Sequence, residues 1–329
     1  MSARQIKTLA IVLLVLVATL VAINVSEDQG DTSINGQLFP QLKGQLNSIS
    51  EVSITRAGES ITVKNNSGQW VVAERDDYPA DTGKLRKLLL ALADASRLEE
   101  KTSNPDMYPR LGVEDMKETS EGVEIRISGA EAPVSLIIGK LAQRKYRYAR
   151  VSGQATSWLI NQNPVVPADA GDWLLPEILD IDASRVRSVT ITHDDGETIH
   201  LQKEDAEDNN FSVPDMPDRR ELRYPSIVNG IAGVVSNLNL EDVSRASASV
   251  GDGSNAKTVF TMFDGLQLTV ESFARDENTW IRLTASQDDA DSSEAAEINA
   301  RTSGWEYQLQ SYKGDQLRRR WNDILKENE

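Results

Sequence analysis

Residues 51–72, EVSITRAGESITVKNNSGQWVV, contain the pattern that decides the fold. Val52-Ser53-Ile54-Thr55 and Ile61-Thr62-Val63 alternate apolar and polar side chains on either side of Ala57-Gly58, which predicts a β-hairpin. Gln69-Trp70-Val71-Val72 follows as an aromatic strand. Because a hairpin pairs its strands antiparallel, this stretch predicts an antiparallel sheet.

The same order of elements returns in the second half of the chain. Residues 189–192 and 199–201 alternate around the turn Asp195-Gly196, and residues 210–213 contain Phe211 in a further aromatic strand. We therefore expect the chain to run through one structural pattern twice.

Each half also contains a predicted helix. In the first half, leucines at i, i+3, i+4 and i+7 spacing predict a helix over residues 85–98. Apolar residues at the same spacing predict an equivalent helix over residues 227–238, although two glycines weaken it. A third helix is expected over residues 315–326. The leucines of the first helix are Leu85, Leu88, Leu89 and Leu92, of which Leu88 and Leu92 are expected to be core residues.

Further alternating segments complete each half. Residues 122–127 and 146–151 predict strands in the first half, and residues 265–270 and 279–283 predict strands in the second. Runs of strands interrupted by a single helix favour an α+β fold over a doubly wound sheet. We expect an N-terminal transmembrane helix followed by two tandem, related modules, each of antiparallel sheet plus helix. The expected parts are the cytoplasmic tip and anchor 1–25, a linker 26–37, the first module 38–175 and the second module 176–329.

The anchor is predicted from an apolar run over residues 9–25, which follows Arg4 and Lys7 and precedes several acidic residues. Its length is at the short end of the roughly 17–25 residues that span a bilayer. Basic residues stay on the cytoplasmic side of a span. We therefore expect a single-pass protein of the inner (cytoplasmic) membrane with its body on the periplasmic side.

A cleaved signal peptide is the alternative for the same run, because the apolar core of such a peptide ends in a small-x-small site. Ile23 and Val25 are bulky at the positions where that site needs small residues. The sequence therefore favours a retained anchor.

The composition excludes several classes of function. The chain has 329 residues and a net charge of -16, and affinity for nucleic acid comes largely from neutralising phosphates with basic residues. Nucleic acid is therefore not an expected partner. The chain contains no cysteine, which excludes disulfides, thiol catalysis and iron–sulfur ligation.

The sequence contains no pattern from which we expect a cofactor, a metal or a catalytic residue. His193 and His200 lie on one predicted hairpin. Histidines in such a position more often belong to a solvent-facing turn than to a metal site. Residues 289–293 begin like a calcium loop but lack its glycine and its final glutamate. No nucleophile elbow and no phosphate-binding loop of the Gly-x-x-x-x-Gly-Lys type occurs in the sequence.

One polar cluster stands out on this acidic chain. A basic run follows residue 139 and is interleaved with Tyr146 and Tyr148. It is the candidate contact surface for a partner loop or an anionic glycan, the alternative being the solvated face of a sheet. The residues of the candidate patch are Lys140, Arg144, Lys145, Arg147 and Arg150.

Several short motifs together resemble the family of domain of unknown function 4340 (DUF4340). The resemblance covers nearly all of the chain after the anchor and is denser in the first half, although Leu111-Gly112 lacks the tyrosine often seen before that glycine. The motifs are Leu38-Phe39-Pro40-x-Leu42, Trp70-x-Val72, Tyr78-Pro79-Ala80-Asp81, Leu111-Gly112-Val113, Ile138-Gly139-Lys140, Tyr148-x-Arg150 and Trp173-Leu174.

The resemblance implies a single-anchor envelope protein of the kind that accompanies ABC-type export systems and gliding-associated proteins. It carries over no catalytic residue. We therefore expect a non-enzymatic accessory subunit with protein partners in an envelope transport complex. A binding module for cell-wall glycan or another anionic envelope polymer is the second hypothesis, and an envelope hydrolase is the third. The sequence names no small-molecule ligand.

Overall fold

The computed structural model describes residues 35–327, except 132, 143–144, 248–253 and 288–292. The predicted anchor lies outside these residues. Among the residues that the structure describes, no helix is long and apolar enough to cross a membrane.

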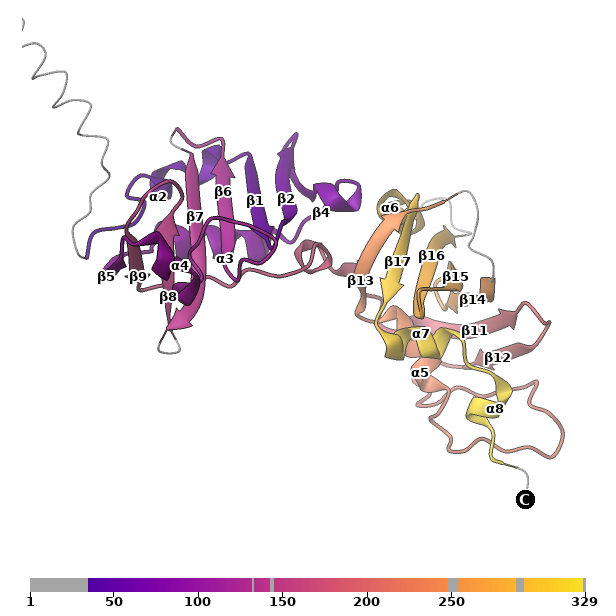
Figure 1. The fold of residues 1–329 in the computed structure, drawn as a ribbon. Helices are drawn as coiled ribbons and strands as arrows, with labels where there is room; N and C mark the ends of the chain where they lie inside the picture. The colour runs from indigo at the N-terminus through magenta and orange to yellow at the C-terminus, as the bar shows by residue number, and fades with distance from the viewer. Residues whose placement is uncertain (1–34, 132, 143–144, 248–253, 288–292, 328–329) are drawn as a thin grey trace, which may run out of the picture. The chain divides into compact units, whose positions relative to one another are not determined.

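The fold is α+β, as the sequence predicts, with two sheets in which every pairing of described register is antiparallel (Figure 1). The first sheet has nine strands in the order β4-β3-β2-β1-β6-β7-β8-β9-β5. Its strands are β1 (Glu51–Arg56), β2 (Glu59–Asn66), β3 (Gln69–Val72), β4 (Tyr78–Pro79), β5 (Arg97–Thr102), β6 (Val123–Ser128), β7 (Val134–Ala142), β8 (Tyr146–Val151) and β9 (Ser157–Ile160).

The second sheet has eight strands in the order β10-β13-β17-β16-β15-β14-β11-β12. Its strands are β10 (Glu177–Leu179), β11 (Val186–His193), β12 (Thr198–Gln202), β13 (Leu238–Arg245), β14 (Ser254–Met262), β15 (Leu266–Arg275), β16 (Asn278–Gln287) and β17 (Trp305–Leu309).

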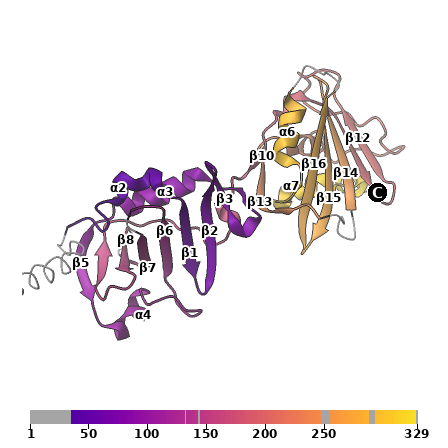
Figure 2. The same ribbon diagram turned by 90° about the horizontal axis from the view of Figure 1, so that it is seen from above.

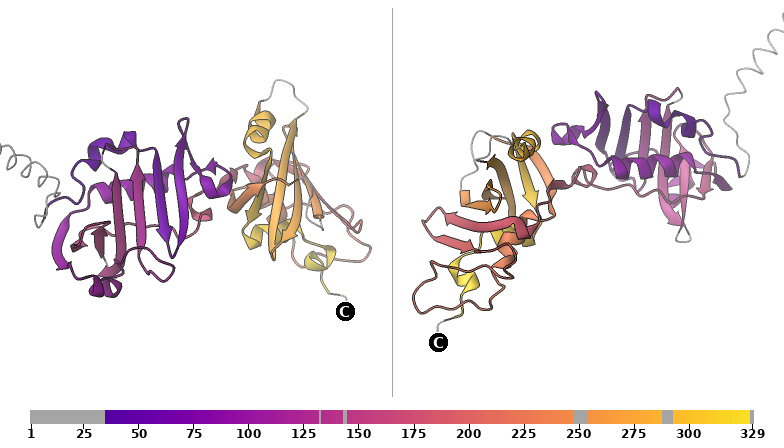
Figure 3. Two further views of the ribbon diagram at one scale, coloured as in Figure 1. Left: turned by 45° about the horizontal axis from the view of Figure 1, so that its top comes forward. Right: turned by 180° about the vertical axis from the view of Figure 1, so that it is seen from behind.

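The helices of the described residues are short. Figure 2 shows α2 and α3 on one face of the first sheet and α4 on the other. In the second sheet, α6 and α7 lie against β16, and α5 lies against β11 (Figure 3). The helices are α2 (Leu42–Gln45), α3 (Thr82–Ala93), α4 (Tyr108–Leu111), α5 (Asn229–Ala232), α6 (Glu294–Thr302), α7 (Ser311–Leu317) and α8 (Trp321–Ile324).

The strand orders of the two sheets correspond. Starting from β2, the first sheet continues β1-β6-β7-β8-β9-β5, and starting from β12 the second continues β11-β14-β15-β16-β17-β13. Each order begins with a hairpin of two consecutive strands. In the first sheet, α3 precedes β5, the strand at the far edge. In the second sheet, α5 and the 3-10 turn Gly233–Val235 precede β13, the strand next to the far edge.

The described residues divide into two compact units. Unit 1 contains residues 35–60 and Gly83–Val166, and unit 2 contains Ile61–Thr82 and the chain from Pro167 onward. The core of unit 1 includes the α3 leucines Leu88 and Leu92, which are 1% and 0% exposed. Their burial confirms the predicted face of this helix.

Four predicted elements are corrected by the structure. The first helix ends at Ala93 instead of residue 98, because the chain from Arg97 pairs with β9 as strand β5. The helix predicted over residues 227–238 is reduced to α5 and a 3-10 turn, Gly233–Val235, since its glycines favour helix poorly. Residues 210–213 form only an isolated bridge between Gln202 and Ser212. The helix predicted over 315–326 is interrupted between α7 and α8.

Candidate functional site

The predicted basic patch lies on the β7–β8 hairpin of unit 1, and its members have different surroundings. The Lys140 ammonium pairs with the Glu121 carboxylate at 2.6 Å and also donates to the Pro109 carbonyl at 3.3 Å. Lys145 is exposed in the turn between the strands. Arg144 lies outside the described residues. Lys140 is therefore already neutralised, whereas Lys145 faces solvent.

Arg150 is a buried structural residue, only 3% exposed. Its Nε donates to the Val113 carbonyl at 2.7 Å, and its guanidinium stacks on the Tyr108 ring at 4.6 Å from the centroid. A further ion pair joins it to Asp115. These contacts fix the segment after α4 against the sheet, so Arg150 is not part of the exposed surface.

Arg147 is half-buried and donates to the Asn163 side-chain oxygen at 2.8 Å and to the Gly139 carbonyl at 3.0 Å. Burial, together with the positive charge of Arg56, lowers the pKa of Arg147. Among the described residues, neither the Arg147 guanidinium nor the Arg56 guanidinium has a carboxylate partner. We call Lys140, Lys145 and Arg147 the hairpin cluster. Its positive charge is least compensated at Arg147 and Lys145.

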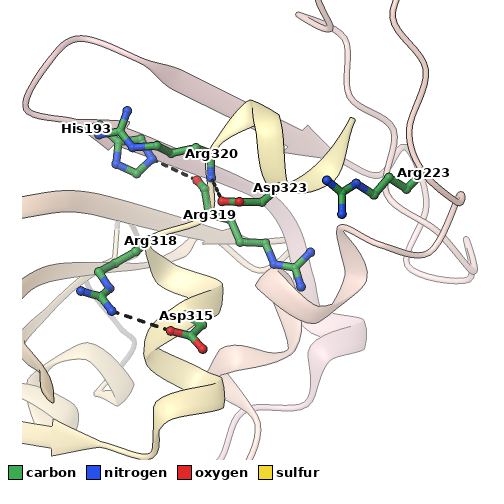
Figure 4. Close-up of a pocket in the computed structure, with 7 residues that line it drawn as sticks. All are labelled: His193, Arg223, Asp315, Arg318, Arg319, Arg320 and Asp323. Atoms are coloured by element: carbon green, nitrogen blue, oxygen red, sulfur yellow. Dashed lines mark hydrogen bonds and ion pairs between the residues drawn. The ribbon is translucent and has the colours of Figure 1, made fainter. Parts of the chain in front are cut away.

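A second basic site is a cavity of about 560 Å³ in unit 2, which Figure 4 shows with its lining side chains. Its wall is formed by the end of β11, the long loop after β12 and the segment between α7 and α8. We call it the arginine cavity. It is lined by His193, Arg223, Asp315, Arg318, Arg319, Arg320 and Asp323.

The break between α7 and α8 creates this cavity. The His193 ring Nε2 donates to the Arg319 carbonyl at 3.0 Å, and the Glu197 carboxylate accepts from the Trp321 N–H at 2.7 Å. The Asp323 carboxylate accepts from the Arg320 N–H at 2.8 Å. These three bonds hold the backbone of residues 319–321 in place, so the arginine side chains project from a fixed segment.

The four arginines of the cavity differ in how fully their charge is compensated. The Arg320 Nη1 lies 2.7 Å from the Asp195 carboxylate and 2.9 Å from the Glu197 carboxylate, and its hydrogen bonds to both raise its pKa. Arg318 pairs with Asp315 at 3.7 Å, a long contact to an aspartate that is 68% exposed. Exposed pairs of this kind contribute little.

Arg223 and Arg319 bond to backbone carbonyls. The Arg223 Nε donates to the Leu325 carbonyl at 3.0 Å and its Nη2 to the Asn322 carbonyl at 2.9 Å. The Arg319 Nη1 reaches the Ile227 carbonyl at 3.5 Å. Within the part of the chain that the structure describes, neither guanidinium contacts a carboxylate.

The two histidines do not converge. His200 is paired in register with Thr190 and bonds to its hydroxyl at 3.0 Å, whereas buried His193 lies on the other face of β11. No group of three metal-ligating side chains occurs among the described residues. The calcium-like residues 289–292 lie outside the described residues.

The arginine cavity is not predicted by the sequence. The run Arg318-Arg319-Arg320 is visible in the sequence, but the helix predicted across it conceals its role. Nothing local links that run to Arg223 or His193, which are far away along the chain. The isolated bridge between Leu222 and Leu325, together with the bonds of Arg223 to the carbonyls of residues 322–325, brings the loop to the C-terminal segment.

The fold and these two sites describe an α+β protein of two antiparallel sheets with one basic cluster on the β7–β8 hairpin and one cavity lined by four arginines. The sequence model of the family described as Domain of unknown function (DUF4340) matches residues 70–257, and the chain belongs to that family. No curated protein and no solved structure matches the chain.

The motifs that carry the family resemblance contact one another in two places. In unit 1, a Cβ on Gly139 would lie 2.2 Å from the Leu111 carbonyl oxygen, so the two glycine motifs pack backbone to backbone. In unit 2, the Asp81 N–H donates to the Trp173 carbonyl at 2.7 Å, and the Leu175 N–H donates to the Pro79 carbonyl at 2.9 Å. These motifs therefore shape the fold.

Proposed function

We propose that this protein is a non-enzymatic, membrane-anchored envelope protein that acts as an accessory subunit of an ABC-type export complex. The apolar run over residues 9–25, with Arg4 and Lys7 before it, supports a single N-terminal span in the inner membrane and a periplasmic body. Membership of the DUF4340 family supports the envelope role.

The proposed contact surface is the hairpin cluster. The observation that carries it is that Arg147 bonds to the Asn163 side chain and the Gly139 carbonyl and has no carboxylate partner among the described residues. Its burial, and to a lesser extent the positive charge of Arg56, lower the pKa of Arg147. Like charges held together in this way favour a negatively charged partner surface. Exposed Lys145 extends the same positive region.

We further propose that the two halves are related modules. The proposal is supported by the corresponding strand orders and by the equivalent places of α3 and α5 in the chain. A second copy of a fold offers a second surface, so the two modules are free to bind different partners.

Binding of an anionic envelope polymer is the second candidate function, and the same uncompensated charge at Arg147 favours it. The two candidates differ in what is retained by the hairpin cluster: a transport subunit in the first, a soluble polyanion in the second.

A topology reporter tests the anchor. An enzyme that is active only outside the cytoplasm, fused after Glu329, should be active, because the basic residues before the apolar run keep the N-terminus inside. Detergent should extract the protein from the membrane, whereas high salt should leave it in the membrane. A mature protein that begins near Ser26 would contradict the retained anchor.

Charge reversal tests the contact surface. In the full-length protein purified from detergent-solubilised membranes, Lys145→Glu combined with Arg147→Glu should reduce recovery of the export ATPase and permease by tenfold or more, since losing a buried interfacial charge pair costs about 2–5 kcal/mol. Lys145→Glu alone should show a smaller loss and leaves the fold intact, because Lys145 is exposed.

Arg86→Glu combined with Lys87→Glu is the matched control, because both residues are exposed on α3 and the change in net charge is the same. Protease resistance reports folding of each variant. If the folded double variant recovers both transport subunits fully, the hairpin cluster is not the contact. If the wild-type protein recovers neither subunit and retains a soluble polyanion through these residues, the second candidate replaces the first.

A further inference from the structure

Four arginines and two aspartates line the arginine cavity of unit 2, and two of the arginines, Arg223 and Arg319, have no carboxylate partner among the described residues. A guanidinium carries five N–H donors. Arg319 uses one of them, in a long 3.5 Å bond to a carbonyl, and Arg223 uses two, both on carbonyls. Among the described residues, neither has a carboxylate partner, so donors and charge remain available at both.

Both residues are tied to one short segment of backbone. The carbonyl that Arg319 reaches belongs to Ile227, and Arg223 begins the same stretch, residues 223–227. The two side chains line one cavity although they come from different parts of the chain (Figure 4). Both side chains are therefore accessible from the same cavity.

The cavity walls are held before any ligand arrives. His193, which is 4% exposed, donates to the Arg319 carbonyl, and the Arg223 N–H donates to the Ile324 carbonyl at 2.9 Å. The Arg320 side chain is occupied by Asp195 and Glu197, which ties the arginine run to the β11–β12 turn. Preorganised donors of this kind lose little freedom when they bind.

We propose that the arginine cavity binds a phosphate group carried on a polar molecule, with Arg223 and Arg319 as the two binding residues. The planar N–H fork of arginine matches the oxygens of phosphate, which it contacts through paired hydrogen bonds. The chain as a whole carries a charge of -16, so the positive charge of the cavity is local and matches a compact group of high charge.

The size and lining of the cavity define the rest of the ligand. Its volume of about 560 Å³ is in the range of small-molecule sites, which is more than a lone phosphate needs. Of the residues that the structure describes, four arginines, two aspartates and one histidine line it, and none has an aliphatic side chain to receive an acyl chain. The bound part is therefore a phosphorylated sugar or glycerol, and this inference concerns a site separate from the hairpin cluster.

The test is calorimetric titration of the full-length protein in non-ionic detergent at constant ionic strength. Glucose 1-phosphate represents a free phosphate monoester and glycerophosphoglycerol represents a lipid headgroup. At least one of them should bind saturably, and unphosphorylated glucose should not. Tighter binding of glucose 1-phosphate indicates a free phosphate monoester as the ligand, and tighter binding of glycerophosphoglycerol indicates a lipid headgroup.

Arg319→Gln is the variant that tests the site. The wild-type Arg319 side chain makes one long hydrogen bond, to the Ile227 carbonyl, so its replacement should affect folding little. It should weaken binding by about tenfold or more, as expected for the loss of a charge-assisted contact. Arg319→Lys keeps the charge and loses the fork, so an intermediate loss is expected. Arg187→Gln is the matched control, an exposed arginine on β11 outside the cavity, and should bind as the wild type does.

Three results overturn the proposal. The first is the absence of saturable binding to either phosphorylated probe. The second is binding that Arg319→Gln and Arg187→Gln affect equally, which would place the ligand elsewhere. The third is tighter binding of succinate than of both phosphorylated probes, which would make the cavity a carboxylate site. Thermal unfolding of each variant, measured without ligand, separates lost binding from lost structure.

Discussion

Replacing Glu306 with glutamine should lower the free energy of unfolding by about 3 kcal/mol at neutral pH, the lower end of the cost of breaking a buried ion pair. The Glu306 side chain on β17 is 1% exposed and forms ion pairs with Arg275 and Arg282. Its carboxylate also accepts from the Ser247 N–H at 3.3 Å. Glutamine keeps the shape but leaves two half-buried guanidiniums uncompensated.

The same variant should change how stability depends on pH. Burial opposes ionisation of Glu306, but the hydrogen bonds and charges of Arg275 and Arg282 outweigh it and lower the pKa of Glu306. A carboxyl whose pKa is lower in the folded state stabilises the protein above its unfolded pKa, about 4.3, and loses that contribution as the pH falls through the folded value. The difference in free energy of unfolding between the wild type and Glu306→Gln should therefore become smaller in acid.

Urea unfolding of the full-length protein in detergent, at neutral pH and again below pH 4, measures both effects. Glu207→Gln is the matched control, since Glu207 is an exposed carboxylate in unit 2, and it should stay within about 0.5 kcal/mol of the wild type. An equal loss in the two variants, or a Glu306→Gln deficit that grows in acid, would show that the buried network is not the source of this stability.

Truncation of Leu92 to alanine should cost about 2–5 kcal/mol, because removing a fully buried leucine loses its transfer free energy and leaves a cavity. Leu92 is 0% exposed on α3, where it belongs to the helix face that packs into unit 1. The chain has no cysteine, so no disulfide limits the loss.

Leu90 provides a control within the same helix. It is 41% exposed, so Leu90→Ala makes the same chemical change away from the core and should cost well under half as much. Both variants are compared by urea unfolding of the full-length protein. A Leu92→Ala loss below roughly 0.5 kcal/mol, the range of surface sites, would be incompatible with the observed packing of α3.

Local patterns were sufficient to predict the fold class. The hairpins β1–β2 and β11–β12 are recognisable from alternation and turn residues, because both signals lie within a few residues of each other. The buried face of α3 is recognisable from leucine spacing for the same reason. The ends of elements were harder to predict. For example, α3 ends at Ala93 because the chain from Arg97 pairs with β9 as strand β5.

The roles of the basic residues could not be predicted from composition. Arg147 and Arg150 are near neighbours in one strand, yet one is half-buried beside Arg56 and the other is enclosed by Tyr108 and Val113. The difference comes from the segment around α4, which covers one of the two. An alternating strand predicts which residues share a face, but not what covers that face.

By itself, the sequence determined the α+β class, the two antiparallel hairpins, the core face of α3 and the family resemblance. The tertiary structure alone decided the arginine cavity, because Arg223 and Arg319 line one cavity only where the loop around Leu222 lies against the C-terminal segment. It likewise decided why Gly139 must lack a side chain, since the Leu111 carbonyl occupies that space. Strand and helix patterns come from neighbouring residues, whereas sites depend on contacts between distant segments, which local periodicity does not encode.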